Sequence, residues 1–154
     1  MLHDFTENEK KILIKNIGKR GINCELIALI EELSELSVAV YHYFSEDDNA
    51  HEYFENLCEE MADVEIALQY LTLSGLSYPI KYTPFESLTT FDCINSIIHE
   101  ICSLLQAESP LMLDEYYFEI LDFIERTKDR LQVNKFVDNI ILKKLKRIEG
   151  LINE

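Results

Sequence analysis

Two pairs of acidic residues stand out in this sequence because of their spacing. Glu32 and Glu35 are three residues apart, and so are Glu60 and Asp63. On a helix, side chains three residues apart point in similar directions, one turn above one another. Residues 22–78, which contain both pairs, hold thirteen carboxylates and no lysine or arginine. That much uncompensated negative charge on packed helices favours a divalent cation as counter-charge, and a bound divalent cation suggests phosphate chemistry.

Two long amphipathic helices are predicted to carry these pairs. Apolar residues recur at helical spacing over residues 23–44 and again over residues 49–74. The connection between them is short and polar, so the helices are expected to pack as an antiparallel hairpin. When the chain folds about the centre of this connection, the acid pairs stand at matching heights, Glu35 opposite Glu60 and Glu32 opposite Asp63.

Four carboxylates at two adjacent levels predict a metal site. Bare carboxylates repel one another strongly at low dielectric, whereas Mg²⁺ and Mn²⁺ prefer oxygen ligands in this arrangement. Glu31 and Glu59 are aimed less well, although either can reach a second metal ion or hold a water molecule. The alternative interpretation is a solvated acidic face, because surface helices are often rich in Glu. The matched heights and the absence of nearby basic residues in the sequence favour the metal site.

The rest of the chain is also predicted to be helical. A capping box, Thr6-x-x-Glu9, begins the first helix. Only four Gly and three Pro occur, and no convincing strand pattern is present, which together indicate an all-α fold. We expect one domain over residues 1–154 with a four-helix-bundle core and additional C-terminal helices. Further helices are expected over residues 6–21, 91–107 and 113–131 and from Asn134, with a connector at 75–84.

Residues 91–131 contain a pattern similar to that of the first hairpin. Glu119-x-x-Asp122 parallels the second acid pair, and Glu100 aligns with the first residue of the first pair. Ser103 stands where that pair would need its second carboxylate. This region is therefore either a degenerate second hairpin, a lid or a dimerisation element, or simply two ordinary amphipathic helices.

Composition excludes several classes of function. The formal net charge is −15, and so acidic a surface repels a nucleic-acid backbone. No apolar run reaches membrane-spanning length and the N-terminus lacks a signal segment, so a soluble, cytoplasmic protein without membrane contact is expected. The four cysteines match no zinc-binding spacing.

Residues 23–73 resemble the MazG-type all-α nucleoside triphosphate pyrophosphohydrolases, a superfamily related to dimeric dUTPases and phosphoribosyl-ATP pyrophosphohydrolases. Its pattern is E-x-x-E, a spacer of one to two dozen residues, and E-x-x-D; here 24 residues separate the pairs. The resemblance implies Mg²⁺-dependent hydrolysis of an NTP or dNTP to the monophosphate and pyrophosphate, with Mn²⁺ as a substitute. It also implies a homo-oligomer, either a dimer or a tetramer.

The resemblance implies roles for individual residues. Glu31 would be an auxiliary ligand or the base that orients water, so Glu31 and Glu32 are the candidate catalytic residues. Glu32, Glu35, Glu60 and Asp63 would ligate the metal.

The cations that bind phosphate must come from outside the hairpin, because none lies on it. Lys81, just beyond the second hairpin helix, is the first choice, and Lys15 is another. The other sources are Lys10, Lys11, Lys19, Arg20, the basic last helix and another subunit.

The sequence departs from the family pattern in one respect. The superfamily often has a Gln shortly before the first acid pair, where this chain has Cys24 and Glu25. Three alternative functions remain open: a phosphoribosyl-ATP pyrophosphohydrolase, a di-iron carboxylate bundle and a non-catalytic helical bundle that binds a nucleotide or a partner. The di-iron bundle is disfavoured because no Glu is followed by His three residues later.

Overall fold

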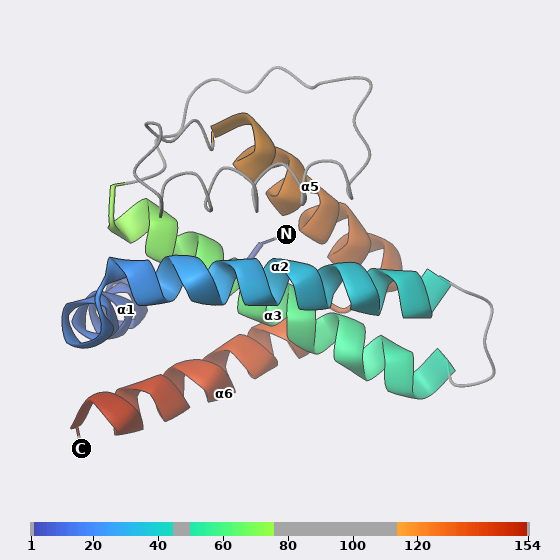
Figure 1. The fold of residues 1–154 in the computed structure, drawn as a ribbon. Helices are drawn as coiled ribbons and strands as arrows, with labels where there is room; N and C mark the ends of the chain where they lie inside the picture. Colours follow the sequence, from blue (N-terminus) through green and yellow to red (C-terminus); the bar gives the residue numbers. More distant parts are fainter. Residues whose placement is uncertain (1, 45–49, 76–113, 154) are drawn as a thin grey trace.

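The computed structural model describes residues 2–44, 50–75 and 114–153, and within them every regular element is a helix (Figure 1). The prediction of an all-α fold is therefore confirmed, and the predicted helix boundaries agree with the observed ones to within one or two residues. The predicted helix at 91–107 and most of the connector at 75–84 lie outside the described residues. The helices are α1 (Glu7–Arg20), α2 (Ile22–Phe44), α3 (Ala50–Leu73), α5 (Asp114–Leu131) and α6 (Asn134–Asn153).

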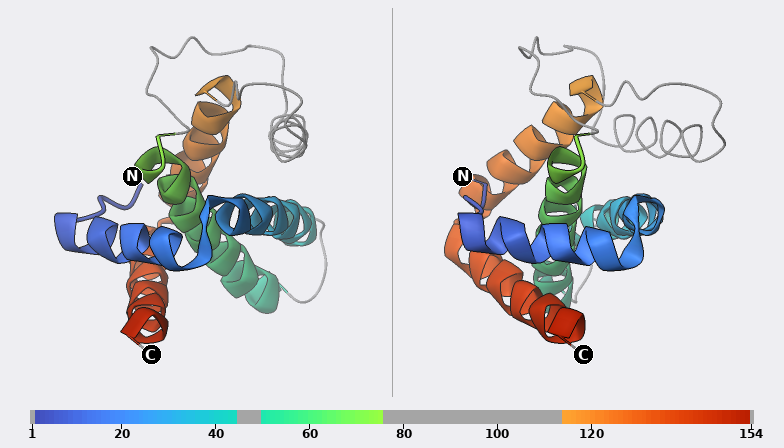
Figure 2. Two further views of the ribbon diagram at one scale, coloured as in Figure 1. Left: turned by 60° about the vertical axis from the view of Figure 1, so that its left-hand side comes forward. Right: turned by 90° about the vertical axis from the view of Figure 1, so that its left-hand side faces the viewer.

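Local sequence signals set the ends of α1. The Thr6 hydroxyl accepts a hydrogen bond from the Glu9 backbone N–H, and the Glu9 carboxylate accepts one from the Thr6 backbone N–H at 2.7 Å, so the predicted capping box is present. Gly21 ends the helix with φ 84°, a backbone conformation that glycine adopts without a steric penalty. Only this residue separates α1 from α2, and α2 leaves α1 at a steep angle (Figure 2).

The α3 helix is central to the fold, because it contacts α1, α2, α5 and α6. The predicted hairpin is present, with α2 and α3 running in opposite directions (Figure 1). Each fully buried leucine in such a core stabilises the fold by roughly 1.5–3 kcal/mol. The buried apolar faces consist mainly of Leu26, Leu29, Leu33 and Leu36 from α2, Leu57, Met61, Val64, Leu68 and Leu71 from α3, and Val137, Ile141 and Leu145 from α6.

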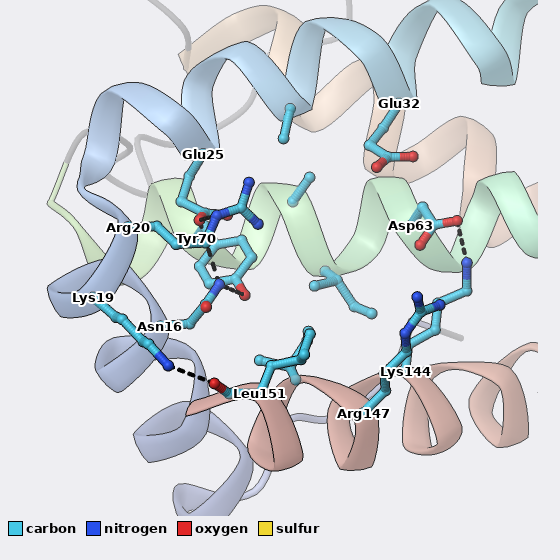
Figure 3. Close-up of a pocket in the computed structure, with 14 residues that line it drawn as sticks. Asn16, Lys19, Arg20, Glu25, Glu32, Asp63, Tyr70, Lys144, Arg147 and Leu151 are labelled. Carbon is cyan, nitrogen blue, oxygen red and sulfur yellow. Dashed lines mark hydrogen bonds and ion pairs between the residues drawn. The ribbon is translucent and has the colours of Figure 1, made fainter. Parts of the chain in front are cut away.

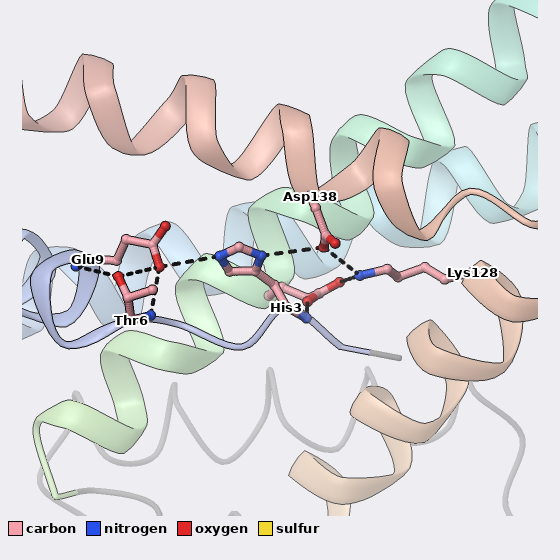
Figure 4. Close-up of polar contacts among 6 residues, drawn as sticks. His3, Thr6, Glu9, Lys128 and Asp138 are labelled. Carbon is pink, nitrogen blue, oxygen red and sulfur yellow. Dashed lines mark hydrogen bonds and ion pairs between the residues drawn. The ribbon is translucent and has the colours of Figure 1, made fainter.

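An ionic network with Lys128 and Glu65 at its buried centre ties the N-terminal segment to three helices (Figure 4). Lys128 of α5 has no exposed side-chain surface, and its Nζ donates a hydrogen bond to Glu65 Oε1 of α3 at 2.7 Å. The other Glu65 oxygen accepts from the His3 backbone N–H at 2.8 Å. Asp138 Oδ1 of α6 lies 3.6 Å from Lys128 Nζ and 3.4 Å from His3 Nδ1. The network therefore fixes the region of α3 that also carries Asp63.

The predicted second hairpin is only partly described. The observed α5 helix agrees with its second half, but the predicted helix at 91–107 and the side chain of Glu119 lie outside the described residues. None of the described helices has the length and the apolar character needed to cross a membrane.

Candidate functional site

The structure brings three of the four predicted metal ligands together. One carboxylate oxygen from each of Glu32 on α2 and Glu60 and Asp63 on α3 lies within 4.8 Å of the others, and all three residues are half-buried. The hairpin register is the cause, because it places Glu32 opposite Asp63. Glu35 is exposed and lies outside this closest set, but its charge still acts on Glu32 and Glu60.

The carboxylates of this cluster destabilise one another's charged forms. Burial, then the charges of Asp63, Glu35 and Glu60, raises the pKa of Glu32 from 4.5 to about 7. Burial, then the charges of Glu35 and Asp63, raises the pKa of Glu60 to about 7 as well. Glu60 Oε2 is buried and accepts no hydrogen bond from the described residues. The cluster therefore lacks part of the positive charge that would stabilise it.

The basic last helix supplies one positive charge to the carboxylate cluster. Lys144 of α6 forms an ion pair with Asp63, and its charge lowers the pKa of both Glu32 and Glu60. Glu31, a predicted catalytic residue, is exposed and is not one of the three carboxylates that lie together.

A cleft of about 640 Å³ adjoins the carboxylate cluster, and residues of α1, α2, α3 and α6 line it (Figure 3). Glu32 and Asp63 lie at one end of it. Four basic residues border the same cleft: Lys19 and Arg20 from α1, and Lys144 and Arg147 from α6. Carboxylates and basic side chains therefore border one space.

The source of these cations was only partly predicted. Lys19, Arg20 and the basic last helix were among the sources considered, and all of them reach the cleft. Lys15 is exposed and is not among the residues that line it. Lys81 lies outside the described residues.

The far end of the cleft holds three buried polar side chains that the sequence did not single out as a group. Asn16 Nδ2 donates hydrogen bonds to Glu25 Oε1 at 3.3 Å and to the Tyr70 hydroxyl at 2.7 Å. Arg20 Nε lies 3.4 Å from the same Glu25 oxygen. Burial raises the pKa of Glu25, and Arg20 opposes that effect. Burial, with the charge of Glu25, also raises the pKa of Tyr70 to about 12, so its hydroxyl keeps its proton at neutral pH.

The metal-free protein is expected to lose thermal stability as the pH rises from 5 to 8. Glu32 and Glu60 bind protons more tightly in the folded state, with pKa values of about 7, than in an unfolded chain near 4.5. Their contribution to stability is therefore present below pH 4.5 and is lost as the pH rises through 7. Melting temperatures in EDTA, followed by circular dichroism, measure this loss, and the double variant Glu32→Gln/Glu60→Gln should show a shallower pH dependence.

Adding Mg²⁺ or Mn²⁺ is expected to have the opposite pH dependence. A metal ion binds ionised carboxylates and stabilises the folded state, so it should raise the melting temperature more at pH 8 than at pH 5. Equal melting temperatures with EDTA and with saturating metal at pH 8 would show that the cluster is a solvated acidic face.

Comparison with known proteins identifies no relative of this chain. No known protein family, no curated protein and no solved structure matches it. Its function is therefore inferred from its own residues.

Proposed function

We propose that this chain is a Mg²⁺-dependent nucleoside triphosphate pyrophosphohydrolase, which cleaves an NTP or dNTP to the monophosphate and pyrophosphate. One observation carries the proposal: a single cleft joins a cluster of carboxylates to four basic side chains. A polyphosphate with a bound divalent cation needs both kinds of group, because the metal is held by carboxylates and the remaining phosphate charge by cations.

The carboxylate cluster fits a hard divalent cation. Its potential donors are all oxygen atoms, three of them lie within 4.8 Å of one another, and one oxygen of Glu60 is buried without a hydrogen bond from the described residues. Glu32, Glu60 and Asp63 would hold the ion, with Glu35 at their border. When bound, Mg²⁺ would clamp phosphate oxygens and lower the pKa of a bound water molecule.

The basic residues would bind the phosphate chain. Lys144 forms an ion pair with Asp63. Its long, flexible side chain can turn from Asp63 toward a phosphate when other charges neutralise that carboxylate. Arg147 lies one turn further along α6 and lines the same cleft, whereas Lys19 and Arg20 line its far end (Figure 3). Lys144 and Arg147 would neutralise the charge that develops on the departing pyrophosphate.

A carboxylate next to the metal ligands would take the proton of the attacking water. Glu35 fits this role better than Glu31 does. Its charge is among the causes that raise the pKa of Glu32 and Glu60, whereas that of Glu31 is not. A general base must lie within hydrogen-bond reach of the water, and Glu35 borders the cluster that would position it.

Product analysis tests the proposed reaction. The purified protein is incubated with Mg²⁺ and each canonical NTP and dNTP, and the products are separated by anion-exchange chromatography. Monophosphate and pyrophosphate are expected. Diphosphate and orthophosphate would contradict the proposed bond cleavage. Hydrolysis of free phosphoribosyl-ATP alone would identify the alternative enzyme, and binding without hydrolysis would favour the non-catalytic bundle.

Lys144→Ala is expected to raise KM for the nucleotide by about 10–100-fold, because a hydrogen bond to a charged group typically contributes 1.5–3 kcal/mol. The variant also releases Asp63 from its ion pair, so the affinity for metal should not fall. Steady-state kinetics and metal titration measure the two effects. Lys135→Ala is the matched control, since Lys135 is an exposed residue of the same helix that does not line the cleft. Equal KM values for the two variants would contradict the role of Lys144.

A further inference from the structure

We propose that Glu25, with Tyr70 and Arg20, reads the nucleobase and selects a base that presents a ring N–H beside a carbonyl group. Guanine, hypoxanthine, uracil and thymine have this edge, whereas adenine and cytosine present a ring nitrogen with a lone pair. The inference rests on the proposed function, since it assigns the other end of the same cleft.

The distance between the two ends of the cleft suits a nucleotide. Glu25 precedes Glu32 by seven residues on α2, and Tyr70 follows Asp63 by seven on α3. Seven residues span about 10 Å of helix, so the same hairpin register that pairs the carboxylates also places Glu25 opposite Tyr70. An extended nucleoside 5′-phosphate separates its base edge from its phosphorus by a comparable length.

Small or apolar side chains line the middle of the cleft. Ala28 of α2 and Ala67 of α3 lie at matching heights between the two polar ends, and both line the cleft. Their small side chains leave space that larger residues would fill. Ile148 and Leu151 of α6 line the same cleft and supply apolar surface. This combination suits the flat faces of a base and a sugar.

The polar groups at the far end of the cleft have hydrogen-bonding capacity that the described residues do not use. Glu25, Tyr70 and Asn16 are only 3%, 5% and 7% exposed, and buried polar groups are nearly always paired. Yet both contacts of Glu25 are made by Oε1, and Oε2 accepts no hydrogen bond from a described residue. The Tyr70 hydroxyl accepts from Asn16 and donates to no described residue.

The unused acceptor and the unused donor define the chemistry of the ligand. A ring N–H can donate to Glu25 Oε2, and an adjacent carbonyl oxygen can accept from the Tyr70 hydroxyl. The terminal nitrogens of Arg20, whose Nε lies 3.4 Å from Glu25 Oε1, offer further donors to such a carbonyl. A ring nitrogen with a lone pair would instead face a carboxylate oxygen, and both atoms would be left unpaired.

Binding measurements with non-hydrolysable triphosphates test this selectivity without catalysis. With Mg²⁺ present, isothermal titration calorimetry should show about 10–100-fold tighter binding of the α,β-methylene analogues of GTP and UTP than of those of ATP and CTP. Testing a purine and a pyrimidine of each kind separates the hydrogen-bonding edge from ring size. Tighter binding of the CTP analogue, whose edge fits a protonated carboxyl group, would overturn the inference.

Two variants connect the selectivity to its residues. Glu25→Gln should remove most of the preference, because an amide can donate to a ring nitrogen as well as accept from an N–H. Tyr70→Phe keeps the ring and removes the donor, so it should weaken binding of the GTP and UTP analogues alone. Glu55→Gln is the control, since Glu55 is an exposed carboxylate of α3 that does not line this cleft.

The outcomes separate this inference from the proposed function. Hydrolysis of all nucleotides at similar rates, together with similar affinities for the four analogues, would refute base selection and leave the pyrophosphohydrolase intact. Selectivity that persists in both folded variants, verified by circular dichroism, would refute the roles of Glu25 and Tyr70. Binding of the GTP and UTP analogues without any hydrolysis would support the inference and refute the enzyme.

Discussion

Replacing Glu32 with Gln is expected to lower Mg²⁺-dependent nucleotide hydrolysis by at least about 10²-fold, because a metal ion contributes several kcal/mol and each 1.36 kcal/mol is tenfold in rate. Glutamine keeps the shape of the side chain and one oxygen but removes the charge that would hold the ion. Asp63→Asn should have a similar effect, since Asp63 faces Glu32 across the hairpin. Pyrophosphate release under kcat/KM conditions measures both losses.

Thermal unfolding distinguishes the loss of a ligand from the loss of the fold. Charged Glu32 destabilises the metal-free protein, as its raised pKa shows, so Glu32→Gln should slightly raise the melting temperature in EDTA at pH 8. The same variant should abolish the stabilisation by Mg²⁺. A melting temperature well below that of the parent protein would instead attribute the lost activity to misfolding.

Glu31→Gln is the matched control for Glu32→Gln. The two residues are adjacent on α2, but Glu31 is exposed and Glu32 is half-buried in the carboxylate cluster. Hydrolysis should fall by less than about tenfold in Glu31→Gln, since the charge of an exposed carboxylate is well screened by water. A loss as large as that of Glu32→Gln would restore Glu31 to the catalytic role that the family resemblance implies.

The hairpin and its carboxylates could be predicted because they depend on local patterns. The apolar spacing defines which face of each helix is buried, and a short connection makes the two helices antiparallel. Helical rise then determines which residues stand at the same height, and Glu32 and Asp63 follow from it. The same register also places Glu25 opposite Tyr70. The pairing at the far end of the cleft could therefore have been predicted from the sequence, although the prediction covered only the acidic pairs.

The basic side of the cleft depends on contacts between distant parts of the chain. Lys144 meets Asp63 across 81 positions of sequence. The apolar spacing of α6 shows which face is buried, since Val137, Ile141 and Leu145 follow one another at intervals of four. It does not show which helix that face packs against. The prediction could therefore name the last helix as a source of cations but not the individual residues.

The apolar stripe of α5 also indicates a buried ion pair, which the sequence prediction did not include. Ile120 and Ile124 are buried, and Lys128 continues the same interval of four residues. A lysine on such a stripe needs a buried partner, because an unpaired charge is costly to remove from water. Glu65 is next to Val64 on the buried face of α3 and is that partner. The pairing joins two helices that are not neighbours in sequence, so periodicity alone does not identify it.

Lys128→Met is expected to destabilise the protein by about 3–5 kcal/mol, because it leaves the Glu65 carboxylate buried without its cation. Methionine is similar in length and apolar, so the loss of packing is small. For a domain of about 150 residues, each kcal/mol corresponds to roughly 2–4 °C in melting temperature. Urea unfolding gives the free energy, and thermal unfolding gives the shift. Arg130→Met, at an exposed position of the same helix, should change stability by no more than about 0.5 kcal/mol.

The double variant Glu65→Gln/Lys128→Met tests whether the uncompensated charge is the cause. It removes both buried charges, and the amide carbonyl that replaces the carboxylate can still accept the hydrogen bond from the His3 backbone N–H. Its stability should therefore exceed that of Lys128→Met, whereas independent effects would add and make the double variant the least stable. If the two losses simply add, the buried pair is not electrostatically coupled, and the cost of Lys128→Met comes from packing. If the double variant recovers stability and also retains hydrolysis, the network serves the fold, and the chemistry of the neighbouring Asp63 does not depend on its charges.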